Sequence, residues 1–497
     1  MANATRSAGD AAPLRLGRAA VLVLLLTLAL RVLWLQCFPV DPTEPVDAEG
    51  YHLLAVNLRE GRGFAIGWEA PFCPTAVRTP FYPAFLMLAY ATLGRDPARA
   101  VLLQLLLEVL TTALVLRMAR DLAHRSSLPV VLAGLLYALN GTTQRYTGYL
   151  LAECLLLPVV TAAFLVALRC LRRPSMPRLG LCAALWASAL LVKPNLQYLA
   201  LAVGVLLTLR LALARTLGSR PLRWACLFWA VLLLTLAPWL LRNRLLFGRW
   251  LLSTAFEENL ARVSVTAIRA QRLDSPVEPW TETWEYLYTA FEAEVSRRFA
   301  WCERTALQGG CVELQQRQRQ IAIAAREEVW THLPELLRAH LRGVLWSILD
   351  PGHRTWYRAL TGADWESTGV AGRLDQRFAW SLERGAPGDA LRAFWLERCV
   401  RIPADAAAIW WLLAGARLAV WILGLRGLLR LRPDPWAALL FSGALAYLIL
   451  LPGPIAYDRF YLPAVPLVAV LLSTPRRRAR RSIVEKAERS LVTPSSS

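Results

Sequence analysis

Ionisable side chains gather at a few points where long apolar stretches of the sequence begin or end. The first group is Asp47-Ala-Glu49-Gly-Tyr51-His52, which follows two prolines and opens a segment of helical character. Two interpretations of Asp47 stay open: it caps that helix, or it is a general base that removes a proton from a hydroxyl. Glu49 is close enough to be the base instead, and Tyr51 is a candidate substrate contact.

Cations at similar boundaries suggest a place for an anion. Arg78 precedes Thr-Pro-Phe-Tyr82-Pro, and its guanidinium could hold a phosphate or simply anchor the chain at an interface. Placing an ionisable group beside hydrocarbon costs free energy, so such groups are typical of functional positions. A functional site is expected where several of them meet. The candidate phosphate-binding residues are Arg78, Arg459, Lys193 and Arg242, and the candidate substrate contacts are Tyr51, Tyr82, Glu153, Asn243 and Asp458.

Apolar helices must position these residues. The chain has 497 residues and is 56% hydrophobic, above the roughly 45–50% of soluble domains. The excess lies in long Leu/Ala/Val blocks, which predict an all-α polytopic membrane protein. A net charge of +20 could suggest nucleic-acid binding. The arginines instead form short tracts between apolar blocks, so no nucleic-acid partner is expected.

The apolar blocks predict about ten transmembrane helices, of which the third, fifth and last are short. Tyr82 to Leu93 is expected to lie along the membrane interface as a helix, and His340 to Ile348 to be an additional short or re-entrant helix. The predicted spans are Gly17–Phe38, Arg99–Ala119, Leu128–Thr142, Glu153–Leu171, Leu179–Val192, Leu196–Ala214, Trp224–Leu241, Ala406–Leu425, Trp436–Leu451 and Phe460–Ser473.

The first apolar block resembles a signal peptide in position. It is long, contains Arg31 and has no small-residue cleavage site, so we interpret it as an uncleaved first span. Arg31 and Glu108 are the main ionisable residues expected inside spans, where each could snorkel or the two could pair.

Every second connection between the predicted spans is rich in arginine. Such tracts mark the cytoplasmic side, so both termini are predicted in the cytoplasm. The high Arg/Ala/Leu usage, with Lys193 and Lys486 as the only lysines, indicates a bacterial protein, which is expected in the inner (plasma) membrane. The opposite, outer side then receives residues 39–98 and 242–405. Four regions follow: a catalytic transmembrane module (1–253), a partly helical outer segment (254–405), C-terminal spans (406–474) and a basic tail (475–497). Within the outer segment, the stretches beginning at Trp280 and Ala324 are predicted to be helical.

Nine cysteines are present. If the outer side is oxidising, Cys302 and Cys311 are a plausible disulfide and Cys37 with Cys73 a weaker one, while free thiols remain an equal alternative. No Cys/His spacing is typical of a zinc site.

These residues resemble the class C glycosyltransferases that use polyprenyl-phosphate sugars, in particular the protein-mannosyltransferase group and its aminoarabinose-transferase branch. The resemblance covers about residues 20–260 and 436–473. It rests on the acidic first loop, on Arg78-Thr-Pro-Phe-Tyr-Pro, on the Pro238-Trp…Arg242-Asn…Phe-Gly run and on Asp458-Arg-Phe-Tyr-Leu-Pro, together with Gly94, Gln104, Glu153 and Pro194.

The resemblance implies an inverting transferase of hexosyl or pentosyl units. The donor would be a sugar on a polyprenyl phosphate, and the acceptor a hydroxyl of a lipid, glycan or protein on the outer side. By the same resemblance, Asp47 matches the general base, and Arg78 and Arg459 match groups that hold the donor phosphate. The two first-loop acids are separated by Ala48, unlike the adjacent pair of some relatives. The base, Asp47 or Glu49, therefore stays open. No cofactor is expected, and a divalent metal requirement also stays open, as do the sugar, the acceptor and the oligomeric state.

Other membrane functions share some of these features. An oligosaccharide ligase or polymerase would also have outer arginines and a large outer loop, but the acidic first loop favours a general-base transferase. A transporter of lipid-linked substrates should show charges in mid-span, broken helices or a repeat. The candidate groups instead gather at one face. A scaffold protein is a further alternative.

Overall fold

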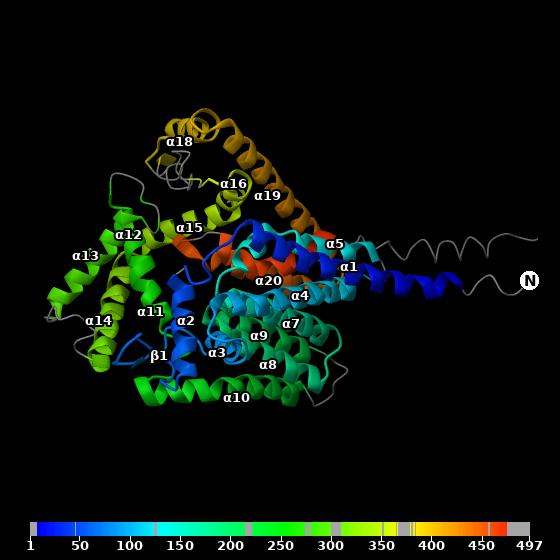
Figure 1. Cartoon of the computed structure of the whole chain (residues 1–497), viewed down its shortest axis with the longest axis horizontal. Helices are drawn as coiled ribbons and strands as arrows, with labels where there is room; N and C mark the ends of the chain where they lie inside the picture. The colour runs from blue at the N-terminus through cyan, green and yellow to red at the C-terminus, as the bar shows by residue number, and fades with distance from the viewer. Residues whose placement is uncertain are drawn as a thin grey trace, which may run out of the picture.

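Helices make up almost the whole of the structure, a computed structural model (Figure 1). It describes residues 7–44, 46–123, 127–213, 221–273, 277, 279, 281–299, 310–349, 352–363, 365, 378, 381–382, 384–455 and 458–474. A helix bundle contains α1 (Ser7–Cys37), α4 (Pro97–Leu122), α5 (Ser127–Ala138), α6 (Gly141–Tyr146), α7 (Ala152–Arg172), α8 (Met176–Val192), η1 (Pro194–Leu196), α9 (Gln197–Ala212), α10 (Pro221–Phe247), α19 (Ala404–Arg430), α20 (Pro435–Leu450), η7 (Asp458–Ala464) and α21 (Val465–Ser473).

Six stretches within the described ranges are helical, long and apolar enough to cross a membrane, which indicates an integral membrane protein. They are Gly17–Cys37, Pro97–Leu122, Ala152–Arg172, Pro194–Ala212, Pro221–Phe247 and Ala404–Arg430. The other four predicted spans coincide with shorter apolar helices: Ser127–Ala138, Met176–Val192, Pro435–Leu450 and Tyr461–Ser473. The prediction of a helical polytopic membrane protein is therefore confirmed. The full count of ten spans, the orientation and the location of the termini stay predictions.

Helix α7 is the best-packed helix of the bundle. In its most apolar window 78% of the residues are buried, against 11% for α19. It packs against α4 and α8, where Phe164 meets Trp186 edge-on with ring centroids 5.1 Å apart. A helix of 21 residues is about 30 Å long, the thickness of a hydrocarbon core. Its two ends can therefore lie at opposite faces of a membrane.

Arginine tracts meet at the C-terminal end of α7. Arg169 pairs with Asp121 of α4 at 2.6 Å, and Arg172 pairs with Asp434, just before α20, at 2.7 Å. Asp121 and Asp434 are the acidic residues within the otherwise basic connections. The tracts around these pairs thus lie at the same end of the bundle, as the charge pattern requires. Glu153 lies at the other end of α7, in its first turn.

Arg31 and Glu108 form a buried network between α1 and α4. Arg31 donates to Glu108 Oε2 from Nε (3.3 Å) and Nη2 (3.1 Å), to the Ala138 carbonyl from Nη1 (2.7 Å) and to the Thr143 hydroxyl from Nη2 (2.6 Å). Tyr137 donates to the same carboxylate oxygen at 3.0 Å. Of the two interpretations offered by the sequence, pairing is therefore the one observed.

The first outer loop folds into two helices and a short hairpin: α2 (Val46–Arg59), β1 (Ala65–Ile66), β2 (Cys73–Pro74) and α3 (Phe81–Leu93). The strands pair antiparallel, with Ala65 opposite Pro74. The buried Asn57 amide donates to the carbonyls of Ala65 (2.8 Å) and Gly67 (3.0 Å), which ties the hairpin to α2. The predicted helix at Tyr82–Leu93 is confirmed as α3, and its position at the interface stays a prediction.

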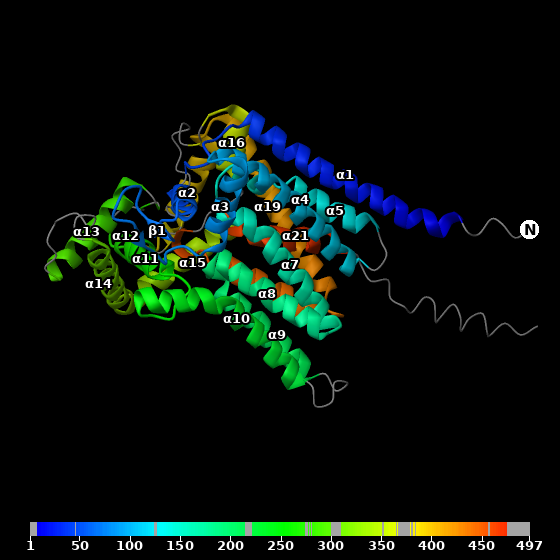
Figure 2. The same ribbon diagram turned by 60° about the horizontal axis from the view of Figure 1, so that its bottom comes forward.

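The outer segment also contains many helices: α11 (Ala255–Asn259), η3 (Leu260–Val265), α12 (Thr266–Ala270), α13 (Glu282–Arg298), α14 (Gly310–Thr331), α15 (Leu333–Leu349), α16 (His353–Thr361), α18 (Pro387–Trp395) and η5 (Leu396–Val400), with η6 (Gly453–Ile455) packed on α15. Leu260, Ile268, Phe291 and Ile321 share a small core of their own. Helices were predicted at both places now occupied by α13 and α14, and residues 340–348 fall within α15. Figures 1 and 2 both show α11 to α14 beside α2 and β1, at one end of the bundle.

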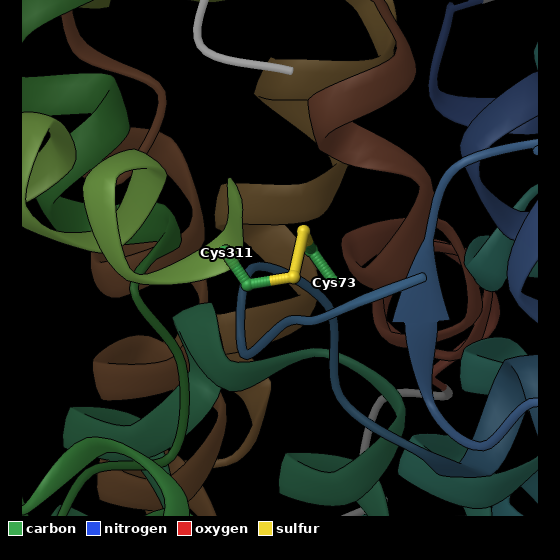
Figure 3. The surroundings of a disulfide bond; sticks show 2 residues. All are labelled: Cys73 and Cys311. Atoms are coloured by element: carbon green, nitrogen blue, oxygen red, sulfur yellow. A yellow bond between two sulfur atoms is a disulfide. The ribbon is translucent and has the colours of Figure 1, made fainter. Parts of the chain in front are cut away.

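A disulfide joins Cys73 to Cys311, with the two Cα atoms 5.1 Å apart (Figure 3). The predicted pairs Cys302–Cys311 and Cys37–Cys73 are therefore wrong. Cys302 lies outside the described residues, and Cys37 is an exposed free thiol. The sequence favoured partners that are near in the chain, whereas folding brings β2 against the start of α14 across 238 residues. The bond places residues 39–98 and the outer segment on the same side, as predicted.

Candidate active site

Five charged side chains from separate parts of the chain form one connected cluster, called the charge cluster below. Asp47 comes from the first turn of α2, Arg78 from the turn before α3, and Glu153 from the first turn of α7. Lys193 follows the end of α8, and Arg459 lies in η7. All five were candidate site residues from the sequence, and the fold brings them together.

Asp47 lies between two guanidinium groups. Its Oδ1 pairs with Nη2 of Arg78, and its Oδ2 lies 2.8 Å from Nη2 of Arg459. Arg78 also lies over the Tyr51 ring, with its central carbon 5.3 Å from the ring centroid. Both carboxylate oxygens are thus directed to cations, and Asp47 lies inside the helix rather than before it. This geometry favours the functional interpretation of Asp47 over the capping one.

Glu153 occupies the deep end of the charge cluster. Its Oε1 accepts from Nε of Arg459 at 2.5 Å and from Nζ of Lys193 at 2.6 Å, and its Oε2 accepts from Nη2 of Arg459 at 3.3 Å. The Glu153 side chain is 2% exposed and that of Arg459 9%. Arg459 therefore bridges the two carboxylates, and Glu153 fixes the orientation of its guanidinium plane.

The cluster opens toward solvent at Asp47 and Arg78, whose side chains are 32% and 28% exposed. Burial by itself would raise the pKa of Asp47, but the positive charges of Arg78, Arg459 and Lys193 outweigh it, so the pKa lies below its ordinary value of 3.8. Asp47 is therefore ionised at neutral pH. Three cations face two carboxylates, which leaves the cluster with a positive charge that an anion can neutralise.

Tyr51 and Tyr82 form the apolar side of the cluster. Their rings meet edge-on, with centroids 4.9 Å apart. The Tyr82 hydroxyl donates to Gln104 at 2.6 Å, and the Gln104 amide donates to the carbonyls of Thr147 and Tyr149, each at 2.9 Å. Tyr82 is fully buried. It therefore supports Tyr51 from behind, and Gln104 links this support to the chain before α7.

Arg242 and Asn243 lie elsewhere and hold loops. Arg242 donates to the carbonyls of Thr75 (2.8 Å) and Phe64 (3.0 Å), and its guanidinium lies over the Trp239 ring at 4.6 Å. Asn243 accepts from Arg242 and donates to the Leu251 carbonyl at 2.9 Å. The structure therefore does not place Arg242 with the other proposed phosphate ligands.

Glu49 and Asp458 are the two remaining candidate residues. Glu49 is exposed on α2, and residues two apart on a helix do not share a face. It therefore does not join Asp47 at the guanidinium groups. Asp458 begins η7, but its side chain lies outside the described part of the structure.

A pocket that the sequence did not predict lies next to Arg78. Its volume is about 140 Å³. The lining includes Pro74 to Val77, Phe247, Arg249, Leu251, Thr254, Glu257, Glu258, Ala261, Tyr288, Gln315, Gln318, Arg319 and Ile321. The adjacent carboxylates Glu257 and Glu258 and the glutamine-rich run at 315–320 are the sequence signals that could have drawn attention to it. No group of three or more His, Cys, Asp or Glu side chains suited to a metal occurs among the described residues.

Three solved structures resemble this chain at low sequence identity. One is the Archaeoglobus fulgidus oligosaccharyltransferase in the apo form, with a TM-score of 0.44, 14% identity and coverage of 96% of this chain and 51% of that one. Another structure of that enzyme, with zinc and sulfate, gives a TM-score of 0.36, 14% identity and coverage of 96% and 56%. This chain thus spans about half the length of the archaeal enzyme.

The third is ArnT from Cupriavidus metallidurans bound to undecaprenyl phosphate, with a TM-score of 0.37, 15% identity and coverage of 96% of this chain and 81% of that one. No protein-family model and no curated protein matches the sequence. All three TM-scores are below 0.5. The reaction is therefore inferred from the side chains of the charge cluster.

Proposed function

We propose that the chain is a membrane glycosyltransferase that moves a sugar from a polyprenyl-phosphate donor to an acceptor hydroxyl at the outer face, with inversion at the anomeric carbon. The observation that carries this proposal is the position of the Asp47 carboxylate between the guanidinium groups of Arg78 and Arg459. A base at Asp47 would then lie within one hydrogen bond of phosphate ligands at Arg78 and Arg459.

The donor phosphate binds to Arg78 and Arg459, with Lys193 adding charge from the deep side. Guanidinium groups bind carboxylates and phosphates through the same fork of N–H donors. We therefore infer that phosphate oxygens are held by the same N–H donors that hold the oxygens of Asp47 and Glu153. The cluster lies at the end of α7 away from the arginine tracts, where a phosphate on a hydrocarbon chain would meet the edge of the bilayer.

Donor binding also activates the base. Asp47 paired with two arginines is a weak base, because their charges lower its pKa. A phosphate that takes over these guanidinium groups withdraws that stabilisation and makes Asp47 more basic. The carboxylate thus gains basicity only when the donor is bound.

The reaction is a single displacement. The acceptor oxygen bonds to the anomeric carbon while the bond from that carbon to the phosphate oxygen breaks. The phosphate keeps the electron pair and is stabilised by the preorganised cations. The hydroxyl proton passes to Asp47. The products are the glycosylated acceptor and the polyprenyl phosphate.

The decisive experiment offers a panel of polyprenyl-phosphate sugars to the purified protein in lipid bilayers and measures sugar release or transfer. Asp47→Asn should lower turnover on the order of 10²–10⁴-fold, with the melting temperature retained. Glu49→Gln, a carboxylate two residues away, is the matched control and should keep wild-type turnover.

Three results would contradict the proposal in different ways. Wild-type turnover by the double variant Asp47→Asn/Glu49→Gln would reject general-base catalysis by the first loop. Activity lost in Glu49→Gln alone would transfer the base role to Glu49. Movement of an intact donor across the bilayer, with no sugar released, would instead identify a transporter.

A further inference from the structure

One wall of the pocket beside Arg78 leads along the chain directly into the charge cluster. This wall is the segment Pro74–Val77, and Arg78 is the next residue. The charge of Glu258, an exposed pocket residue, acts on Arg78. A molecule in the pocket would therefore lie next to the site where Asp47 is held.

Several hydrogen bonds hold this wall in place before any ligand binds. Ser253 donates to the Val77 carbonyl at 2.6 Å, and the Thr254 amide donates to the Ala76 carbonyl at 2.9 Å. Arg242 donates to the Thr75 carbonyl at 2.8 Å. A wall held by three hydrogen bonds has the preorganisation that a binding site needs. It also gives Arg242 a role in positioning rather than in direct contact with phosphate.

The opposite wall is one face of α14. Gln315 and Gln318 follow Cys311 by four and seven residues, so the three side chains lie on the same face of the helix. Cys311 is bonded to Cys73, which directly precedes the Pro74 wall (Figure 3). The disulfide therefore holds the glutamine face of α14 against the first outer loop.

The chemistry of the lining favours a neutral, hydroxyl-rich ligand. Arg249 already donates to Glu257 at 2.6 and 3.1 Å, and Arg319 donates to the Phe247 carbonyl at 2.6 Å. The remaining wall offers the Glu258 carboxylate, two amides, the Thr254 hydroxyl and the Tyr288 ring. Carboxylates and amides accept and donate to hydroxyl pairs, and aromatic rings cover apolar C–H faces. A sugar ring presents both kinds of surface.

We propose that this pocket binds the acceptor and that the acceptor group seated there is a carbohydrate, with Glu258, Gln315 and Gln318 as its polar contacts. That the bound molecule is the acceptor rests on the proposed function. That the pocket binds a carbohydrate does not depend on it. The donor then uses the cation-rich cluster, and the acceptor uses the pocket, where two guanidinium groups balance two carboxylates, so the two substrates are sorted by charge.

Saturation-transfer NMR tests the site with methyl glycosides of glucose, galactose, mannose and arabinose on the full chain in lipid nanodiscs. At least one glycoside should receive saturation from the wild-type protein. The signal should fall several-fold in Glu258→Gln/Gln315→Ala and in Gln318→Trp, which fills the pocket from its exposed wall. Gln316→Ala is the matched control, because Gln316 is a neighbouring exposed glutamine outside the lining, and it should keep the signal.

The transfer assay separates this inference from the proposed function. We expect the pocket variants to raise the acceptor KM several-fold. The apparent donor affinity should stay constant in Gln318→Trp, which keeps the Glu258 charge that acts on Arg78. Sugar transfer with an unchanged acceptor KM in both pocket variants, or no saturation of any glycoside, overturns the inference alone. Glycoside binding that is lost in the pocket variants, combined with no turnover of any donor, overturns the proposed function and supports the carbohydrate site.

Discussion

Carboxylates meet guanidinium groups at two places in this molecule, and the two places differ in exposure and in charge balance. Arg31 and Glu108 are 0% and 1% exposed, and one cation faces one carboxylate. In the charge cluster, Asp47 and Arg78 reach solvent, and three cations face two carboxylates. The same chemical groups thus form a closed network in one place and an open, positively charged one in the other.

The contacts of each arginine show what this difference means. Arg31 donates hydrogen bonds from its guanidinium nitrogens to Glu108, to a carbonyl and to a hydroxyl, all inside the bundle. An incoming anion would have to break a buried network to reach it. Arg78 holds one oxygen of a part-exposed carboxylate, which a phosphate can replace. We infer that the first network ties α1 to α4 and that the second exchanges partners during a reaction cycle.

The largest expected effect concerns the closed network. Glu108→Gln leaves Arg31 charged and buried without a counter-ion, which should lower the free energy of unfolding by about 3–5 kcal/mol. Thermal melting of the purified protein measures this loss. Turnover per folded molecule should stay near the wild-type value, because Glu108 does not belong to the charge cluster.

The double variant Arg31→Met/Glu108→Leu sharpens this test. Replacing both charges by apolar groups removes the desolvation cost as well as the attraction, so most of the stability should return. A double variant as unstable as Glu108→Gln would show that the pair contributes more than mutual neutralisation. Lost turnover in a well-folded double variant would show that the closed network takes part in function.

The next effect concerns the bridge between the carboxylates of the open cluster. Arg459→Met removes the cation that contacts both Asp47 and Glu153, and the donor KM should rise roughly tenfold to a hundredfold, or about 1.4–2.8 kcal/mol. Arg459→Lys keeps the charge but not the planar fork, so it should recover only part of the loss. Kinetics at varied donor concentration measure both, and an unchanged donor KM in Arg459→Met would reject the phosphate site.

The pH dependence of turnover tests whether the donor phosphate replaces Asp47 at Arg78 and Arg459. Since the pKa of Asp47 is lowered in the free enzyme, the active ionised form persists as pH falls to values below 3.8, and the acid limb of kcat/KM lies there. The acid limb of kcat should lie at higher pH, because kcat reports the donor-bound state, in which phosphate has taken the arginines. Arg78→Met should move the limb of kcat/KM upward. Coincident limbs would contradict activation by the donor.

The sequence predicted all five members of the open cluster because they are ionisable residues at the ends of apolar blocks. It could not predict which residues pair. Lys193 and Glu153 are 40 positions apart and Arg459 is 306 positions from Glu153, so only packing of α7 against α8 and η7 brings them together. Arg242 has the same sequence context as Lys193, yet it binds loop carbonyls. A basic residue at a helix end does not reveal which way its side chain turns.

The pocket and the disulfide were missed for a related reason. Local spacing made Cys302 the nearer partner of Cys311, and the glutamines of α14 carry no charge signal. Both features depend on how the outer segment packs on the first loop, where residues over 200 positions apart in the sequence meet. Apolar periodicity predicts helices well, but it contains little information about contacts between segments that are mainly polar.

The smallest expected effect comes from the disulfide. Cys73→Ser/Cys311→Ser frees the glutamine face of α14 from the wall at Pro74, so the acceptor KM should rise a few-fold. The donor KM should stay constant, because no residue of the charge cluster is held by this bond alone. Cys37→Ser, at an exposed free thiol, is the matched control. Mass spectrometry of non-reduced peptides checks the pairing itself, and a peptide joining Cys302 to Cys311 would reject the observed bond. If the pairing holds but donor and acceptor KM rise together, the pocket and the charge cluster form one site, and the sorting of substrates by charge is wrong.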